Sequence, residues 1–143
     1  MHFPLYSGVK ALHIGIVKGS VLTPAPAYDQ PPVVFYGSSI TQGGCASRPG
    51  NCYQNIISRR LGADYVNLGF SGSARAEDTM IEWIRNMEMS VFIQDYDHNA
   101  PTMAHLKDTH ARMFEGVRAA NPTLPIVILS RPKYDLTEEE TAR

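Results

Sequence analysis

Hydrophobic and polar positions between residues 33 and 130 follow two alternating patterns. Short, continuous apolar runs rich in β-branched and aromatic residues predict buried strands at Val33–Tyr36, Tyr65–Leu68, Val91–Ile93 and Pro125–Leu129. Apolar residues three or four positions apart predict amphipathic helices over Cys52–Leu61, over Ala76–Met89 and from about Pro101 to Asn121. Gly62 and Pro122 are placed to end two of these helices.

Strands that alternate with amphipathic helices are typical of a parallel sheet with helices on both faces. We therefore expect an α/β fold, a three-layer α/β/α sandwich. In such folds, ligands bind at the carboxyl ends of the strands. The loops after the first three strands are accordingly the places to look for chemistry.

The two ends of the chain fall outside this alternation. Leu12, Ile14 and Ile16 alternate with less apolar positions, which predicts a half-buried strand, and we interpret residues 1–18 as the remnant of another sheet. The proline-rich residues 19–32 predict a linker. Thr137 and Glu140 form the capping box of a new helix, yet the chain stops at residue 143. We expect a domain over residues 33–143 that lacks its C-terminal part.

Composition narrows the function classes. The chain has 143 residues, of which 43% are hydrophobic and 19% charged, which argues against a disordered protein. A formal net charge of -1 argues against a partner that is a nucleic acid. The start resembles no signal peptide, and the apolar runs are too short for a membrane span. We expect a soluble domain that acts on, or binds, a small molecule.

Polar residues follow each of the first three strands. The first loop reads Gly37-Ser38-Ser39-Ile40-Thr41-Gln42-Gly43-Gly44, and a serine flanked by glycines at such a turn has the exposure that a nucleophile needs. An ordinary glycine-serine turn and a phosphate cradle are the alternatives, but the phosphate-binding glycine motifs are absent. Gly72 in the second loop can present a bare N–H, and Asn99 in the third can donate its amide. Together these residues predict a catalytic site at the carboxyl ends of the strands.

These motifs resemble the SGNH (GDSL-type) esterase and acylhydrolase superfamily. The closer resemblance is to the branch whose motif appears here almost entire from Gly37 to Gly50. In that branch, a segment similar to residues 4–10 belongs to a small β-domain that precedes the hydrolase domain. Ser38 stands where the broader family often has Asp, a departure usual in this branch.

The resemblance implies a role for each matching residue. Ser39 would be the nucleophile, and its own N–H, the Gly72 N–H and the Asn99 side chain would form the oxyanion hole. The reaction implied is cleavage of a small acyl ester, such as an acetyl group on carbohydrate, with no cofactor. A silent binding module for an acylated or glycan ligand and a phosphate-binding flavodoxin-like domain are the alternative functions.

The general base that would activate Ser39 has no clear candidate in this sequence. The family supplies it from a D-x-x-H motif after a further strand, and we expect the chain alone to be a feeble esterase at most. Asp95 and His98 have the same spacing, but their segment already supplies Asn99. His105 and His110 are interpreted as solvated or core-edge residues, Trp83 as a packing residue and Arg48 as a surface residue. No metal-ligand spacing occurs, and Cys45 and Cys52 are interpreted as independent thiols, although a disulfide is conceivable.

Overall fold

The computed structural model describes residues 1–130. Four strands and four α-helices lie in this part of the chain. In chain order they are β1 (Val33–Gly37), α1 (Ser39–Gln42), α2 (Tyr53–Leu61), β2 (Tyr65–Gly69), α3 (Asp78–Arg85), β3 (Val91–Asp95), α4 (Met103–Ala120) and β4 (Ile126–Ile128). Single 3-10 turns occur at Pro49–Asn51 and Asp97–Asn99.

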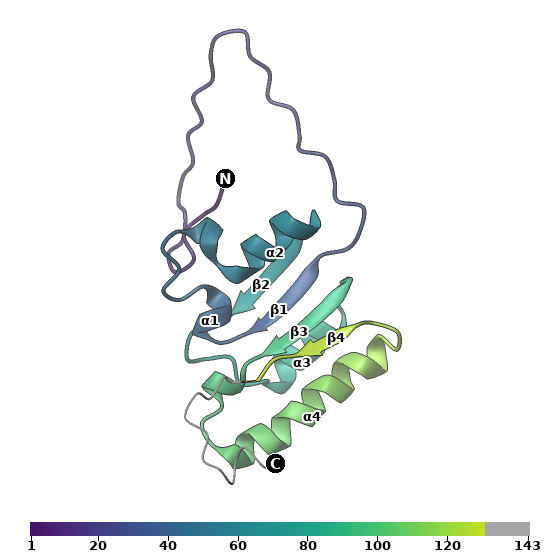
Figure 1. Cartoon of the computed structure of the whole chain (residues 1–143). Coiled ribbons are helices and arrows are strands. Elements are labelled where there is room, and N and C mark those ends of the chain that lie inside the picture. The colour runs from purple at the N-terminus through teal and green to yellow at the C-terminus, as the bar shows by residue number, and fades with distance from the viewer. Residues whose placement is uncertain (131–143) are drawn as a thin grey trace.

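The four strands form one parallel sheet in the order β2-β1-β3-β4. Helices α1 and α2 cover one face of the sheet, and α3 and α4 pack against each other on the opposite face (Figure 1). This arrangement confirms the predicted α/β three-layer sandwich. The helix predicted over Cys52–Leu61 is α2, and it ends at Gly62, which has a left-handed backbone (φ 61°).

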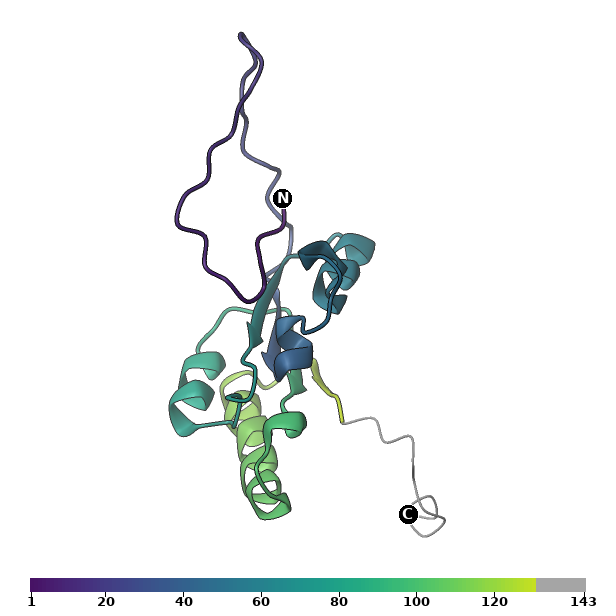
Figure 2. The same cartoon turned by 90° about the vertical axis from the view of Figure 1, so that its left-hand side faces the viewer.

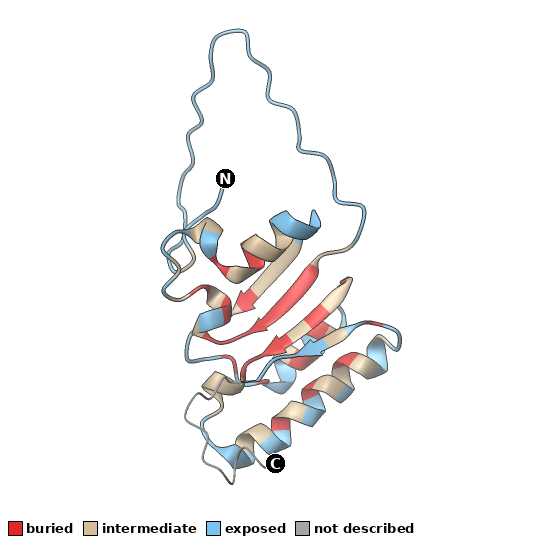
Figure 3. Ribbon diagram, viewed as in Figure 1, coloured by how far each residue is buried: buried red, intermediate tan, exposed pale blue. Residues whose placement is uncertain are grey.

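The core lies mainly between the sheet and the pair α3–α4. Strand β1 is buried along its whole length (Figure 3). Val34 and Tyr36 belong to the cluster that includes Ile84 of α3 and Met113 of α4. Phe35 points the other way and meets the Tyr53 ring of α2 edge-on, with ring centroids 5.6 Å apart. Because successive strand residues face opposite sides, one short strand contributes to both cores.

Two predicted elements differ from the structure. Helix α3 is shorter than the predicted Ala76–Met89, because Ala76 has a left-handed φ of 53° and the Asn86 side chain bonds back to the Glu82 carbonyl oxygen at 2.7 Å. The fourth strand was predicted to be buried, but Val127 is 42% exposed. Within residues 1–130, β4 pairs only with β3 and stands at the edge of the sheet.

Residues 1–32 contain neither helix nor strand, and most of this segment extends away from the sandwich as a long loop (Figure 2). The strand predicted at Leu12, Ile14 and Ile16 is wrong for this structure, since these residues are about half exposed and the described chain offers them no strand to pair with. The capping box at Thr137 and Glu140 lies outside the described residues. None of the helices described is both long and apolar enough to cross a membrane.

Candidate active site

The loop after β1 forms a tight turn into α1. Ser38 is fully buried, and its side-chain oxygen accepts a hydrogen bond from the Ile40 N–H at 3.2 Å, which caps the helix. Ser39 is the first residue of α1 and is half-buried. Its hydroxyl makes no hydrogen bond with any residue of the described chain. The sequence predicted this serine as a nucleophile, and its side chain is available for that role.

Thr41 anchors α1 to the sheet through both its hydroxyl and its carbonyl. The hydroxyl donates to a carboxylate oxygen of Asp95 at 2.9 Å, and the Tyr53 hydroxyl donates to the same oxygen at 3.1 Å. The carbonyl oxygen of Thr41 accepts two side-chain amides, from Gln54 at 2.6 Å and Asn67 at 2.9 Å. These buried contacts join α1 to α2, β2 and β3, so the turn that carries Ser39 is fixed from several directions.

Sequence reasoning missed this network. Asp95 was considered only as the partner of His98, and Thr41, Tyr53 and Gln54 were given no role. The partners are separated by 12 to 54 residues along the chain, so no local spacing links them. A buried Asp at the end of a central strand is the one signal available, since buried carboxylates need donors.

Burial dominates the electrostatics of the network. It raises the pKa of the Asp95 carboxyl above its usual value, although the hydrogen bonds from Thr41 and Tyr53 oppose this effect. Burial likewise raises the pKa of the Tyr53 hydroxyl, so this group stays a hydrogen-bond donor. The pKa of the Tyr36 hydroxyl on the other face is also raised by burial, and this hydroxyl accepts the Ala76 N–H at 2.8 Å.

The second and third loops are more open. Gly72 is exposed and has a left-handed φ of 73°, a conformation that suits glycine. Its N–H donates to no acceptor within residues 1–130. Asn99 ends the 3-10 turn after β3, and its side-chain amide donates to the Phe70 carbonyl oxygen at 2.8 Å. The third loop is therefore tied directly to the second.

All three loops begin at strand ends that are in register with one another. Gly37 at the end of β1 is in register with Gly69 of β2 and with Asp95 of β3. The Ser38 N–H donates to the Asp95 carbonyl oxygen at 3.2 Å, and the Phe70 N–H donates to the Gly37 carbonyl oxygen at 2.9 Å. The segments that carry Ser39, Gly72 and Asn99 are thus joined at the carboxyl ends of the strands, as the sequence predicted for these loops.

Comparison with known proteins agrees with this geometry. Residues 30–141 match the family model of the GDSL-like lipase/acylhydrolases. The chain belongs to the GDSL-like lipase/acylhydrolase family. No curated protein sequence matches the chain.

Two solved structures resemble the fold. One is described as a GDSL-like lipase from Bacteroides ovatus ATCC 8483, with 33% identity and a TM-score of 0.65, and the match covers 69% of this chain and 29% of that protein. The chain therefore spans less than a third of this relative. The other is a mutant of the esterase AlinE4, with 14% identity and a TM-score of 0.52, covering 81% of this chain and 68% of that one. The latter similarity concerns the fold alone.

A GDSL-like hydrolase needs a base beside its nucleophile, but none of the five histidines of the chain forms a hydrogen bond with Ser39. Asp95 and His98 form no ion pair, and the bonded carboxylate oxygen of Asp95 serves Thr41 and Tyr53 instead. His105 bonds the Arg75 carbonyl oxygen at 2.9 Å, and the His110 ring stacks on Tyr96. Both are half-buried at the edge of the core.

The cysteines, possible metal ligands and Arg48 are the remaining candidates. Cys45 is exposed and Cys52 is buried, and both are free thiols. Within residues 1–130, no group of three or more histidine, cysteine, aspartate or glutamate side chains could hold a metal ion. Arg48 is exposed, as expected for a surface residue.

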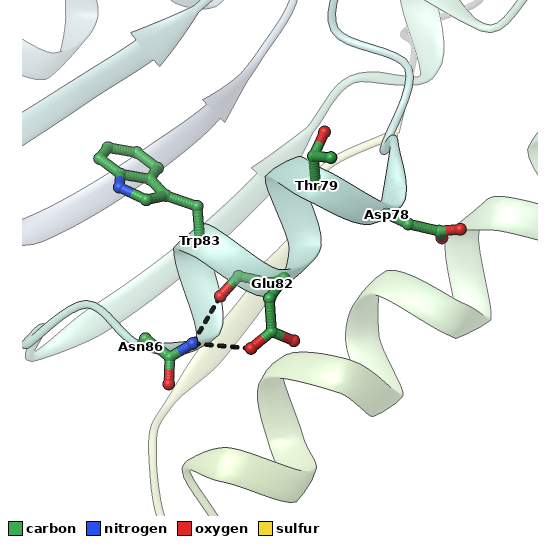
Figure 4. Close-up of a pocket in the computed structure, with 5 residues that line it drawn as sticks. All are labelled: Asp78, Thr79, Glu82, Trp83 and Asn86. Atoms are coloured by element: carbon green, nitrogen blue, oxygen red, sulfur yellow. Dashed lines mark hydrogen bonds between the residues drawn. The ribbon is translucent and has the colours of Figure 1, made fainter.

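Trp83 lies on α3 in this GDSL-like domain and corrects one prediction. It was interpreted as a packing residue, yet it is 52% exposed. It lines an open groove of about 570 Å³ with Asp78, Thr79, Glu82 and Asn86 (Figure 4). The reason is helical geometry, because Trp83 precedes the buried Ile84 by one residue and so lies about 100° around the helix from it. None of Ser39, Gly72 and Asn99 lines this groove.

Proposed function

We propose that this chain carries the nucleophile and oxyanion-binding residues of a serine hydrolase that cleaves carboxylic esters. The observation that carries the proposal is Ser39. It stands at the carboxyl end of the central strand with an unbonded hydroxyl, on a turn fixed by buried hydrogen bonds. Membership of the GDSL-like family supports ester hydrolysis as the type of reaction.

In this reaction the Ser39 Oγ attacks the carbonyl carbon of the ester while its proton passes to a base. The tetrahedral intermediate collapses, the alcohol leaves with a proton, and the acyl group remains on Ser39. Water then attacks the acyl-enzyme, which releases the carboxylic acid and restores the Ser39 hydroxyl. Covalent catalysis of this kind divides one difficult step into two easier ones.

Three donors are available for the negative charge of the intermediate. The Ser39 N–H lies in the first turn of α1, where it has no acceptor within the helix. The Gly72 N–H has no acceptor within residues 1–130, and the Asn99 amide retains a second N–H besides the one bonded to Phe70. Donors already in place when charge develops are among the largest contributions to enzymatic catalysis.

The resemblance to SGNH hydrolases assigns the base to a D-x-x-H segment that follows a further strand. The same resemblance suggests a small acyl ester as substrate, with an acetyl group on carbohydrate as one example. A hollow of about 250 Å³ lies beside the Asn99 turn, and its lining combines the apolar side chains of Ala100, Met103 and Leu106 with the polar Asp97 and Thr102. Its apolar side chains suit an acyl chain or the apolar part of an alcohol.

The test is acyl transfer to Ser39. The chain is incubated with p-nitrophenyl acetate, release of p-nitrophenol is followed, and peptide mass spectrometry locates any acetyl group. We expect slow acetylation at Ser39, and we expect Ser39→Ala to abolish both the acetylation and the weak release of p-nitrophenol that depends on it. Ser20→Ala is the control, because Ser20 is exposed and lies in the extended loop. Equal turnover by the Ser39→Ala protein and the parent would refute the proposal.

The binding-module alternative has its own observation in favour, namely that no histidine of the chain forms a hydrogen bond with Ser39. It predicts that acetylated sugars bind with the same affinity to the parent and to Ser39→Ala, with no acetyl transfer. Isothermal titration calorimetry with an acetylated monosaccharide separates this outcome from catalysis.

A further inference from the structure

Residues His2–Tyr6 lie against the turn that carries the proposed nucleophile. Leu5 is the only one of the first 30 residues that is not exposed. Residues 7–30 extend away from the sandwich, whereas the start of the chain lies beside the loop between α1 and α2 (Figure 1). The N-terminal segment is therefore attached to the domain at two places, through β1 and through this contact.

Two hydrogen bonds make the attachment. The Tyr6 hydroxyl donates to the carbonyl oxygen of Ser39 at 3.1 Å. The Gln42 side-chain amide donates to the Leu5 carbonyl oxygen at 3.1 Å, while its oxygen accepts the Ser71 N–H at 2.8 Å. Gln42 thus joins the N-terminal segment to the loop that contains Gly72. Pro4, Leu5, Gln42, Asn67 and Gly69 line a small hollow at this junction.

The glycines of the motif make room for this segment. A Cβ on Gly43 would overlap the Leu5 side chain. A Cβ on Gly44 would lie 3.1 Å from the Tyr6 hydroxyl, and one on Gly50 would lie 2.8 Å from the His2 ring. Three glycines of the motif between Gly37 and Gly50 thus adjoin residues of one peptide segment. Some glycines of this motif therefore allow the N-terminal segment to pack closely against the loop.

We infer that Tyr6 is a positioning residue for Ser39, an inference that rests on the function proposed above. The Ser39 carbonyl oxygen also accepts the Gly43 N–H at 3.1 Å and the Gly44 N–H at 2.7 Å, so the Tyr6 hydroxyl is a third donor to the same atom. Together these bonds orient the peptide plane that follows Ser39. That plane, in turn, limits the direction of the Ser39 Oγ and N–H, and small errors in such directions slow a reaction strongly.

The position of Tyr6 predicts an effect on the reaction step rather than on substrate affinity. Tyr6 touches the backbone of the nucleophile on the side of the Gly43 turn and contributes no donor to the oxyanion. Because Tyr6 is 52% exposed, water competes for the hydroxyl and the contribution of the bond is modest. Replacing it should lower kcat and leave KM nearly unchanged.

Tyr6→Phe tests this inference, with Tyr28→Phe as a matched control. Both residues are 52% exposed and both lie in the N-terminal segment, but Tyr28 makes no hydrogen bond within the described chain. With p-nitrophenyl acetate, we expect Tyr6→Phe to lower kcat about fivefold with KM within about twofold of the parent. Tyr28→Phe should match the parent in both constants.

Hydrogen exchange provides a readout that does not depend on turnover. In Tyr6→Phe, the amides of Gly43 and Gly44 should exchange faster, while those of α4 keep their rates. If Ser39→Ala abolishes turnover and Tyr6→Phe changes neither kcat nor exchange, the positioning role is wrong and the proposed function stands. If Ser39→Ala leaves turnover unchanged, the proposed function is wrong, and the exchange of Gly43 and Gly44 alone decides whether Tyr6 holds the turn.

Discussion

The first loop and the pair formed by the second and third loops differ in how firmly they are held. In the first, Ser38 and Thr41 are fully buried, and Thr41 alone receives or makes four side-chain hydrogen bonds. In the second and third, Ser71, Gly72 and Ser73 are exposed, and the one short side-chain bond between the loops joins Asn99 to Phe70. The nucleophile is thus on a preorganised turn, whereas two of the proposed oxyanion donors are on segments with few contacts.

This difference predicts that the first loop mainly determines stability, whereas the second and third loops mainly affect catalysis. Substitutions in the network of Thr41, Asp95 and Tyr53 should lower the free energy of unfolding, because they break buried hydrogen bonds. Loss of the oxyanion donor at Asn99 should alter turnover and leave the fold almost intact, because little packing depends on that side chain.

Among substitutions in the second and third loops, Asn99→Ala should have the largest effect on catalysis. It removes one oxyanion donor, and loss of such a donor typically lowers kcat by about 10² to 10³-fold. The melting temperature should change little, since the lost contact to Phe70 lies at the surface. Hydrolysis of p-nitrophenyl acetate and thermal denaturation measure the two effects. Asn86→Ala, at the exposed end of α3, is the control. A large loss of stability with unaltered kcat would show that the third loop contributes to stability and not to catalysis.

Asp95→Ala should have the largest effect on stability. It leaves the Thr41 and Tyr53 hydroxyls without their shared acceptor, and we expect the free energy of unfolding to fall by about 3 kcal/mol. Asp95→Asn keeps an acceptor oxygen and should cost less. Urea denaturation measures both. A decrease no larger for Asp95→Ala than for the exposed Asp29→Asn would show that the network does not hold the turn.

The same Asp95→Asn protein also tests the pKa shift. Since burial raises the pKa of Asp95, the folded protein binds a proton that the unfolded chain has already released in the pH range between the unfolded and folded pKa values. The free energy of unfolding therefore falls as pH rises through that range. Asp95→Asn should remove this component of the pH dependence, whereas a curve of unchanged slope would contradict the raised pKa.

The contrast also explains what the sequence could predict. Between residues 33 and 130, strand and helix positions follow from local patterns, and the structure confirms them apart from the length of α3, the exposure of β4 and the short helix α1, which the patterns do not predict. Ser39, Gly72 and Asn99 could be found because each follows the end of a strand, and parallel strands end at one edge. Their catalytic roles come from the family resemblance and stay proposals.

The other features depend on distant contacts. Nothing near Thr41 in the sequence indicates that it will share a carboxylate oxygen of Asp95 with Tyr53, and nothing near Ser39 points to Tyr6. The alternation at Leu12, Ile14 and Ile16 shows the converse error, since a strand pattern without a partner strand remains an extended loop. Local pattern predicts elements, and only the assembled fold shows what holds them.

Gly72→Ala, in the second loop, should have the smallest effect on turnover. No atom lies within 4 Å of a Cβ placed there, so the change adds only the cost of a left-handed backbone, about 1 kcal/mol. The N–H remains, and turnover should stay within about threefold of the parent. Gly43→Ala, in the first loop, has a left-handed φ of 104° and also an overlap with Leu5, so it should lower the free energy of unfolding further. Equal losses in urea denaturation would mean that packing against the N-terminal segment adds nothing, and the first loop would then be no more constrained than the second.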